Sequence, residues 1–224
     1  MEPEALYRRI RDETIEMLAR RTTDADRTVP ACPEWDVRDV LGHVVDICAR
    51  ATRRLTGGPE PAAVPAGGAP VADLLAKWRR DGALLDRLLA TGETRLSRIL
   101  VMDAFTHWLD LRQCFGLLPP AEHPAYLPMI EVVMGGFSAE VAARDLPPLH
   151  VVTDGRDWTA GRGQAAATLS AAPHDLFRTL TGRRTFDQVA RLAWSTDPAP
   201  WLPALTWGPF TPPARAAEEV VRPG

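Results

Sequence analysis

Three side chains that could bind a metal ion fall on two segments with helical patterns. In ILVMDAFTHWLDLRQCFG, residues 99–116, Asp103 and His107 are four residues apart, so both project from one face of a helix. They occupy an inward stripe that is otherwise apolar, and His43 lies at the edge of the apolar face of an earlier helix. Two imidazoles and one carboxylate form a ligand set for Zn²⁺ or a neighbouring divalent metal, with a position left for water or substrate.

A second interpretation of the same pattern needs no metal. A free carboxylate inside a helical bundle costs several kcal/mol unless a partner compensates it. His107 or an arginine could be that partner for Asp103, as a structural pair in the core. The spacing of the residues leaves both interpretations open.

Length and composition describe an ordinary globular protein. The 224 residues allow one large domain or two modest ones, and the hydrophobic fraction of 46% is typical of a soluble chain. The net charge of −3 gives no general attraction to nucleic acid or to an anionic membrane surface. We therefore expect neither nucleic acid nor membrane as a partner. The chain could be a monomer or a homodimer, and the small-molecule substrate that we expect is implied by the resemblance described below.

Other features of the composition concern the cell compartment. The N-terminal segment MEPEALYRRIRDE has no apolar core of a signal peptide, and no stretch is long enough to span a membrane. Cys32, Cys48 and Cys114 are odd in number and lack a CxxC spacing, which disfavours disulfides and a zinc knuckle. We expect a cytoplasmic protein with reduced cysteines. Arginine carries almost all the positive charge, with Lys77 the only lysine, as in GC-rich genomes such as actinobacterial ones.

The first part of the chain has the periodicity of amphipathic helices. We expect four of them, over residues 4–21, from Asp36 to Gly57, from Val71 to near Gly92, and up to Gly116. Asp36 and Asp39 have the spacing of a helix-capping pair. The four helices favour an up-and-down bundle, with a further helix over about 124–144 beside it.

The segment GGPEPAAVPAGGAP, residues 57–70, contains too much proline and glycine for a regular element. It is long for a connection within a bundle. It is therefore expected to be a mobile surface loop or a lid over a site.

After Pro147 the hydrophobic period changes from that of a helix to that of a strand. LHVVTDGRDWTA reads as a hairpin around Asp154 and Gly155, AAATLSA as a third strand, and PHDLFRTLT as a short helix ending before Gly182. The expected fold class is α+β. Residues 1–145 would form the helical bundle, 146–213 a small α+β domain, and 214–224 a disordered tail.

Two segments carry a family resemblance. TVPACPEWDVRDVLGHVV, which contains His43, and FTHWLDLRQCFG resemble the two motifs of the mycothiol-dependent maleylpyruvate isomerase family. The resemblance spans nearly the whole chain, but its C-terminal part is loose. It implies a DinB-like four-helix bundle with a divalent metal bound by His43, Asp103 and His107, Zn²⁺ being the first choice. Asp103 stands where the family more often has glutamate.

The resemblance implies further roles. Asp110 and Arg112 match an Asp-x-Arg sequence after the second motif; Asp110 could orient a ligand histidine, or the two could form a surface ion pair. Arg183 matches a Gly-Arg near the family's site, where it could hold a substrate carboxylate, or it could be an ordinary surface arginine. Trp35 and Trp108 are expected to serve packing, and the cysteines are not expected to act as nucleophiles.

The resemblance also implies a reaction class. Mycothiol would be the cosubstrate, and a metal can deprotonate a coordinated thiol to give a nucleophile at neutral pH. The expected function is a metal-dependent, thiol-using isomerase or transferase that acts on a small electrophile. Two alternatives stay open: a thiol-independent metalloenzyme of hydrolysis or specialised metabolism, and a non-catalytic metal-binding or ligand-binding protein.

Overall fold

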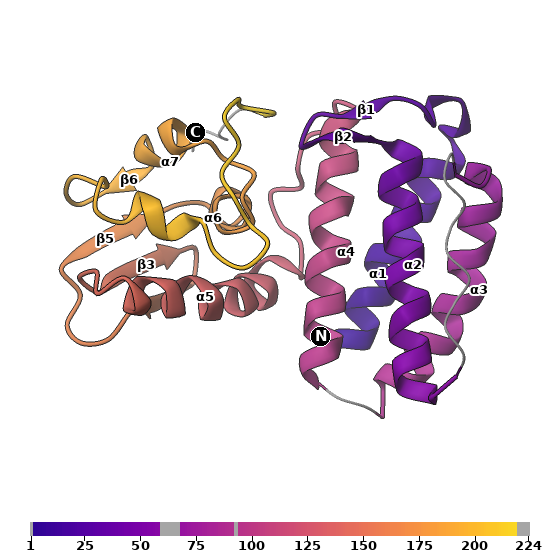
Figure 1. The fold of residues 1–224 in the computed structure, drawn as a ribbon, viewed down its shortest axis with the longest axis horizontal. Coiled ribbons are helices and arrows are strands. Elements are labelled where there is room, and N and C mark those ends of the chain that lie inside the picture. Colours follow the sequence, from indigo (N-terminus) through magenta and orange to yellow (C-terminus); the bar gives the residue numbers. More distant parts are fainter. Residues whose placement is uncertain (1, 59–67, 92–93, 219–224) are drawn as a thin grey trace. The chain divides into compact units, whose positions relative to one another are not determined.

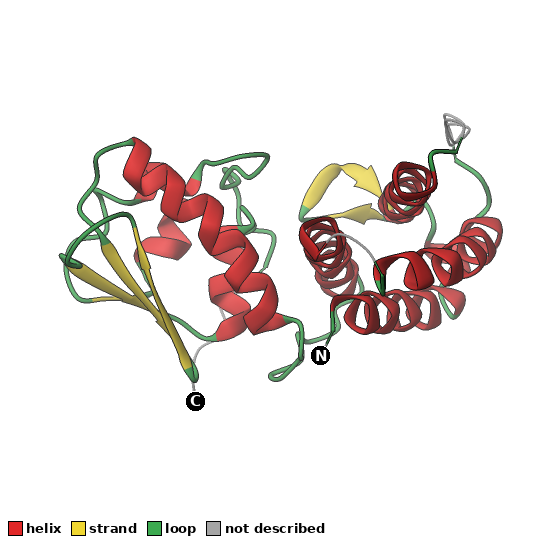
Figure 2. Cartoon of the chain, turned by 90° about the horizontal axis from the view of Figure 1, so that it is seen from below, coloured by secondary structure: helices red, strands yellow, loops and turns green. Residues whose placement is uncertain are grey.

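The computed structural model describes residues 2–58, 68–91 and 94–218. The chain divides into two compact units, Met1–Pro119 (unit 1) and Pro120–Gly224 (unit 2). Unit 1 is helical and unit 2 combines helices with a sheet (Figures 1 and 2), which confirms the expected α+β fold class. In the described part of the chain, no helix is long and apolar enough to cross a membrane.

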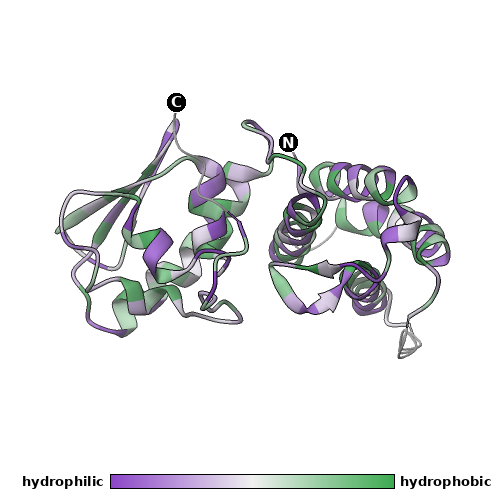
Figure 3. Cartoon of the chain, turned by 90° about the horizontal axis from the view of Figure 1, so that it is seen from above, coloured by the Kyte–Doolittle hydropathy of each residue, from purple (hydrophilic) through white to green (hydrophobic). Residues whose placement is uncertain are grey.

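Unit 1 is a four-helix bundle, as expected. Its helices are α1 (Pro3–Ala19), α2 (Val37–Thr56), α3 (Val71–Leu89) and α4 (Thr94–Cys114). Helices α1 and α2 each pack against both α3 and α4, so the four helices form a ring around one core. Hydrophobic and hydrophilic bands alternate along them (Figure 3), as in helices that bury only one face. Ile10, Leu41, Leu85 and Phe105 are among the fully buried core side chains.

The expected up-and-down order of the helices is wrong. Gly68, just before α3, lies against the side chain of Arg38 at the start of α2, so α2 and α3 begin at the same end of the bundle. Helices α2 and α3 therefore run in the same direction, and α4 runs opposite to both (Figure 1). The amphipathic pattern determines which face of a helix is buried but is the same for either direction, which is why the sequence did not show this.

Local chemistry fixes the position of α2. The Asp36 side chain accepts a hydrogen bond from the Asp39 backbone N–H and the Asp39 side chain accepts one from the Asp36 N–H, which confirms the predicted cap. At the other end Gly57 adopts a left-handed conformation with φ of 67°. Before the cap, a short antiparallel pair of strands, β1 (Thr28–Val29) and β2 (Cys32–Asp36), leads into the helix.

Unit 2 combines three helices with a four-stranded sheet. The helices are α5 (Tyr126–Ala143), α6 (Pro173–Leu180) and α7 (Phe186–Ala190), and the strands are β3 (Leu149–Thr153), β4 (Arg156–Ala160), β5 (Ala167–Ser170) and β6 (Ala193–Trp194). The strand order is β4-β3-β5-β6, with the predicted β3–β4 hairpin antiparallel and β5 parallel to β3. Short 3-10 helices lie in both units: η1 (Thr22–Asp24) in unit 1 and η2 (Leu202–Leu205) in unit 2.

The boundary between the units differs from the expected one at residue 145. Helix α5 packs on α6 and β4, so it belongs to unit 2 and not to the bundle. Its apolar residues face a sheet and a helix whose presence the pattern of α5 alone could not indicate. The expected tail also differs, because Glu218 is bonded to Arg178 and Arg184 of unit 2. Residues 59–67 of the predicted loop and 219–224 of the predicted tail lie outside the described residues.

Candidate metal site

The structure brings His43 of α2 together with Asp103 and His107 of α4. His43 Nε2 lies 3.2 Å from Asp103 Oδ1, and His107 Nε2 lies 3.9 Å from the same oxygen. One donor atom from each residue lies within 4.8 Å of the others. This spacing, with two imidazoles and a carboxylate, suits the ligand chemistry of a single divalent metal such as Zn²⁺. It also contains the direct His43–Asp103 contact that the metal-free interpretation requires.

The three side chains are accessible to different degrees. The side chain of His107 is 9% exposed, whereas those of Asp103 and His43 are 24% and 28% exposed. Asp103 is thus partly hydrated, and the desolvation cost that the inward pattern suggested is smaller than expected. Because His43 and Asp103 can be reached from solvent, the three residues could bind a small molecule or ion.

Behind His107 lies a second carboxylate. Asp110, one turn further along α4, is completely buried and its Oδ2 lies 3.2 Å from His107 Nδ1. A carboxylate on one ring nitrogen fixes the orientation of the imidazole and makes the other nitrogen a better ligand. Of the two roles predicted for Asp110, its burial and its contact with His107 fit the orienting role and not a surface ion pair with Arg112.

Two further residues next to the site were not predicted to lie there. Cys32 Sγ contacts Asp110 Oδ2 at 3.7 Å, and Cys32, His107 and Asp110 form a second group whose donor atoms lie within 4.8 Å of one another. The ring of Trp35 lies 5.1 Å from that of His43 and 5.9 Å from that of His107, measured between centroids. Trp35 thus packs as expected, but it packs on the two histidines.

The helical bundle of unit 1 matches a known protein family. The family model described as the DinB superfamily matches residues 6–119, which is nearly all of unit 1. The chain belongs to the DinB superfamily. A search of curated proteins finds no significant match.

Two solved structures are similar to this DinB-superfamily chain. One is a mycothiol-dependent maleylpyruvate isomerase, with a TM-score of 0.59 and 14% sequence identity, over 87% of this chain and 92% of that one. The other is a histidine-to-alanine mutant of such an isomerase, with a TM-score of 0.59, 13% identity and the same coverage. At these identities the likeness establishes a shared fold, which extends beyond the DinB bundle into unit 2.

The remaining predicted residues of this DinB protein have other contacts. Arg112 donates through Nη2 to the carbonyl oxygen of Leu118 at 2.6 Å, and its guanidinium lies 4.9 Å from the centre of the Trp108 ring. Arg183 belongs to unit 2, where its Nη1 donates to the carbonyl oxygen of Thr181 at 2.8 Å. The candidate ligands His43, Asp103 and His107, called the metal cluster below, all lie within unit 1, so a role for Arg183 stays a prediction.

Proposed function

We propose that this protein is a metal-dependent, mycothiol-using isomerase or thiol transferase that acts on a small electrophile. The observation that carries the proposal is the convergence of His43, Asp103 and His107 at the seam between α2 and α4. The shared fold with a mycothiol-dependent maleylpyruvate isomerase supports it. Zinc is the metal we propose first, because two imidazoles and one carboxylate form a three-ligand set that leaves an open position.

Each residue of the site has a distinct role in this proposal. His43, Asp103 and His107 would hold the metal, which when bound supplies a deprotonated thiol at neutral pH. Asp110 would keep the His107 ring in one orientation through the 3.2 Å contact at Nδ1. Trp35 covers one side of both imidazoles and would exclude water from that side. For Arg183, which belongs to unit 2, the family resemblance alone supports the proposal that it binds a substrate carboxylate.

The test combines metal analysis with turnover. The protein is purified without a histidine tag, its metal content is measured, and maleylpyruvate conversion is followed with and without mycothiol. We expect about one divalent metal per chain and conversion that requires both the metal and the thiol. A fully active metal-free protein would contradict the proposal, and conversion that needs the metal but no thiol would favour a thiol-independent enzyme.

A further inference from the structure

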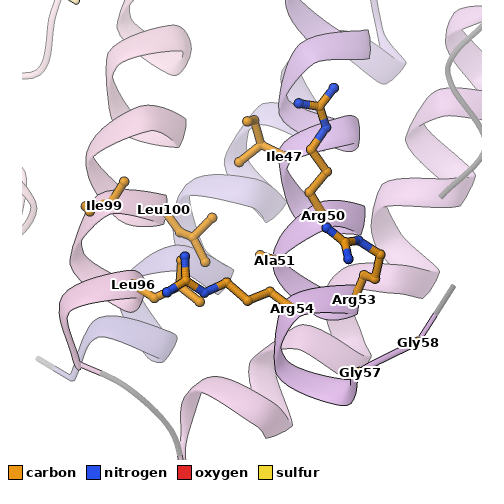
Figure 4. A pocket seen from close by; sticks show the side chains of 10 residues that line it. All are labelled: Ile47, Arg50, Ala51, Arg53, Arg54, Gly57, Gly58, Leu96, Ile99 and Leu100. Carbon is orange, nitrogen blue, oxygen red and sulfur yellow. The ribbon is translucent and has the colours of Figure 1, made fainter. Parts of the chain in front are cut away.

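A second feature of the bundle lies on the same seam as the metal cluster. A cavity of about 510 Å³ opens between α2 and α4 (Figure 4). It is lined by Ile47, Arg50, Ala51, Arg53, Arg54, Gly57 and Gly58 from α2 and its end, and by Leu96, Ile99 and Leu100 from α4.

The cavity and the three candidate metal ligands lie along the same two helices. Ile47 is one helical turn after His43, and Ile99 is one turn before Asp103. Because α2 and α4 run in opposite directions, both steps lead the same way along the seam. At 1.5 Å per residue, Arg50 lies about 10 Å and Arg54 about 16 Å along the helix from His43.

The lining has two chemically different parts. Leucine, isoleucine and alanine side chains form an apolar floor, on which Ile99 is 43% exposed. Arginines from the last turns of α2 form the other part, and no acidic residue is among the ten that line the cavity. Arg54 extends from α2 toward Leu96 and Leu100 on α4 (Figure 4).

A purely structural role accounts for only part of this arrangement. Arg53 and Arg54 lie in the last turn of α2, where positive charge is favourable to the helix dipole. Arg50 lies before that turn and is paired through Nη2 with Asp46 at 2.7 Å, a contact that engages one of its three guanidinium nitrogens.

We propose that this groove binds an organic carboxylate with an apolar body. The carboxylate lies at the arginines, the apolar body covers the Ile99 side of the floor, and the opposite end of the molecule points toward His43 and Asp103. The anionic group then lies within about three helical turns of His43 along α2. The proposal that the end near His43 and Asp103 is the one that reacts rests on the proposed function. The proposal that the arginines bind the anion does not.

The experiment measures the binding of defined probes by calorimetry. Hexanoate, octanoate and decanoate are titrated into the full-length metal-free protein, with methyl octanoate as the neutral match and octyl sulfate as a different anion. Each added methylene is expected to raise the affinity about threefold to fourfold. Octanoate is expected to bind at least about tenfold more tightly than its methyl ester, because hydrogen bonds to charged groups contribute this much. Octanoate binding tighter than that of octyl sulfate would support the carboxylate as the anionic group.

Substitutions in α2 and α4 test which residues bind the carboxylate. Arg50→Ala and Arg54→Ala are each expected to weaken octanoate binding about tenfold, and both positions are exposed, so the bundle should fold. Arg98→Ala is the matched control, because Arg98 is an exposed arginine of α4 that does not line the cavity. Ile99→Asp adds a negative charge to the floor and should weaken binding at least as much.

The outcomes separate this inference from the proposed function. Equal affinity for octanoate and its methyl ester would overturn the proposed carboxylate binding. Equal effects of Arg54→Ala and Arg98→Ala on octanoate affinity would do the same, and both results are independent of activity with mycothiol. Arginine-dependent binding that persists in His43→Ala would support the groove even if maleylpyruvate turnover fails. Binding that is lost in His43→Ala and unchanged in Arg50→Ala would place the carboxylate at the metal cluster and overturn the inference.

Discussion

Two clusters of charged and titratable side chains differ in how their charges are balanced. In unit 2, Arg178 and Arg184 are completely buried. Arg184 Nη2 donates to Asp175 Oδ1 at 2.6 Å and Arg178 Nε donates to Glu218 Oε1 at 2.6 Å, while Arg184 also pairs with Glu218. Burial favours the neutral form of Glu218, but the two arginines outweigh it and hold the pKa of this carboxyl below its usual value.

The metal cluster of unit 1 has the opposite character. His43, Asp103 and His107 converge on one point, two of them are partly exposed, and none of the three is an arginine or lysine. The comparison teaches that the pairing of a buried charge matters more than its burial, because the buried arginines of unit 2 are each bonded to a carboxylate. Donor atoms that converge at an accessible place are the better sign of a binding site.

The largest effect is expected where a buried charge loses its partner. Arg184→Ala would leave Asp175 without the guanidinium it is bonded to, so the free energy of unfolding should fall by about 3–5 kcal/mol. Arg183→Ala is the matched control, since this half-buried neighbour donates to the Thr181 carbonyl and should cost about 1 kcal/mol. Urea unfolding monitored by circular dichroism measures both. Equal losses of unfolding free energy in the two variants would show that the buried ion pairs of unit 2 do not have the structural role assigned to them.

Asp103→Asn should affect binding far more than stability. The amide keeps the size of the side chain but lacks the anionic donor, so we expect zinc affinity to fall at least about a hundredfold. Because Asp103 is partly exposed, the metal-free protein should change by less than about 1 kcal/mol in stability. Asp103→Glu keeps the charge and should retain the metal. Competition titration with a zinc chelator gives the affinities.

The metal-free interpretation makes the reverse prediction for the same variant. If Asp103 only pairs with His43, Asp103→Asn would lower stability, with zinc binding unchanged. That result would mean that the charges of the unit 1 cluster, like those of the unit 2 cluster, serve stability.

Acid should weaken unit 2 through His174. Burial, with the charges of Arg178 and Arg184 in addition, lowers the pKa of His174 to about 3, and His174 Nδ1 lies 3.0 Å from the Tyr126 hydroxyl. Between an unfolded pKa of about 6.5 and pH 3, the unfolded chain binds a proton that the folded one does not, so stability falls as pH falls. From pH 7 to 5 this loss is about 2 kcal/mol.

The measurement for His174 is a difference between proteins. Urea unfolding at pH 7 and pH 5 is compared for the natural chain and His174→Gln. The variant should lack the part of the pH dependence that comes from the imidazole. An identical loss in both proteins would assign the acid sensitivity to other groups.

The smallest predicted effect concerns Asp110. Asp110→Asn keeps the shape of this buried side chain but weakens its hold on His107 Nδ1, so zinc affinity should fall about tenfold. Arg112→Ala tests the neighbouring predicted residue, whose contacts are with Leu118 and Trp108, and should leave zinc affinity within about twofold. A larger effect at Arg112 than at Asp110 would contradict the role of the buried carboxylate.

Features encoded by local chemistry could be predicted from the sequence. The cap of α2 by Asp36 and Asp39, and the bounds of α6 between Pro173 and Gly182, follow from side chains that act on their own backbone. The pairing of Asp103 with His107 on one helix face follows from the four-residue spacing.

Features that depend on distant partners could not be predicted. The direction of α3 and the packing of α5 in unit 2 depend on which elements meet, and the amphipathic pattern does not contain this information. Cys32 and Trp35 were missed as neighbours of the site because β2, with the sequence CPEWD, does not alternate between buried and exposed residues. The signal that could have located Trp35 is its position just before the cap of the helix that bears His43.

The parallel arrangement of α2 and α3 has a consequence for the rate of folding. Helices that follow one another in a simple bundle form hairpins, whose contacts are local and form quickly. Here α1 packs on α3 and α4, while α2 packs on α3, which runs parallel to it, and on α4, which follows α3 in the chain. The contacts that build the core, and with them the meeting of His43 with Asp103, must therefore close long loops. Unit 1 should fold more slowly than hairpin-built bundles of its length, at rates closer to those of mixed α/β domains.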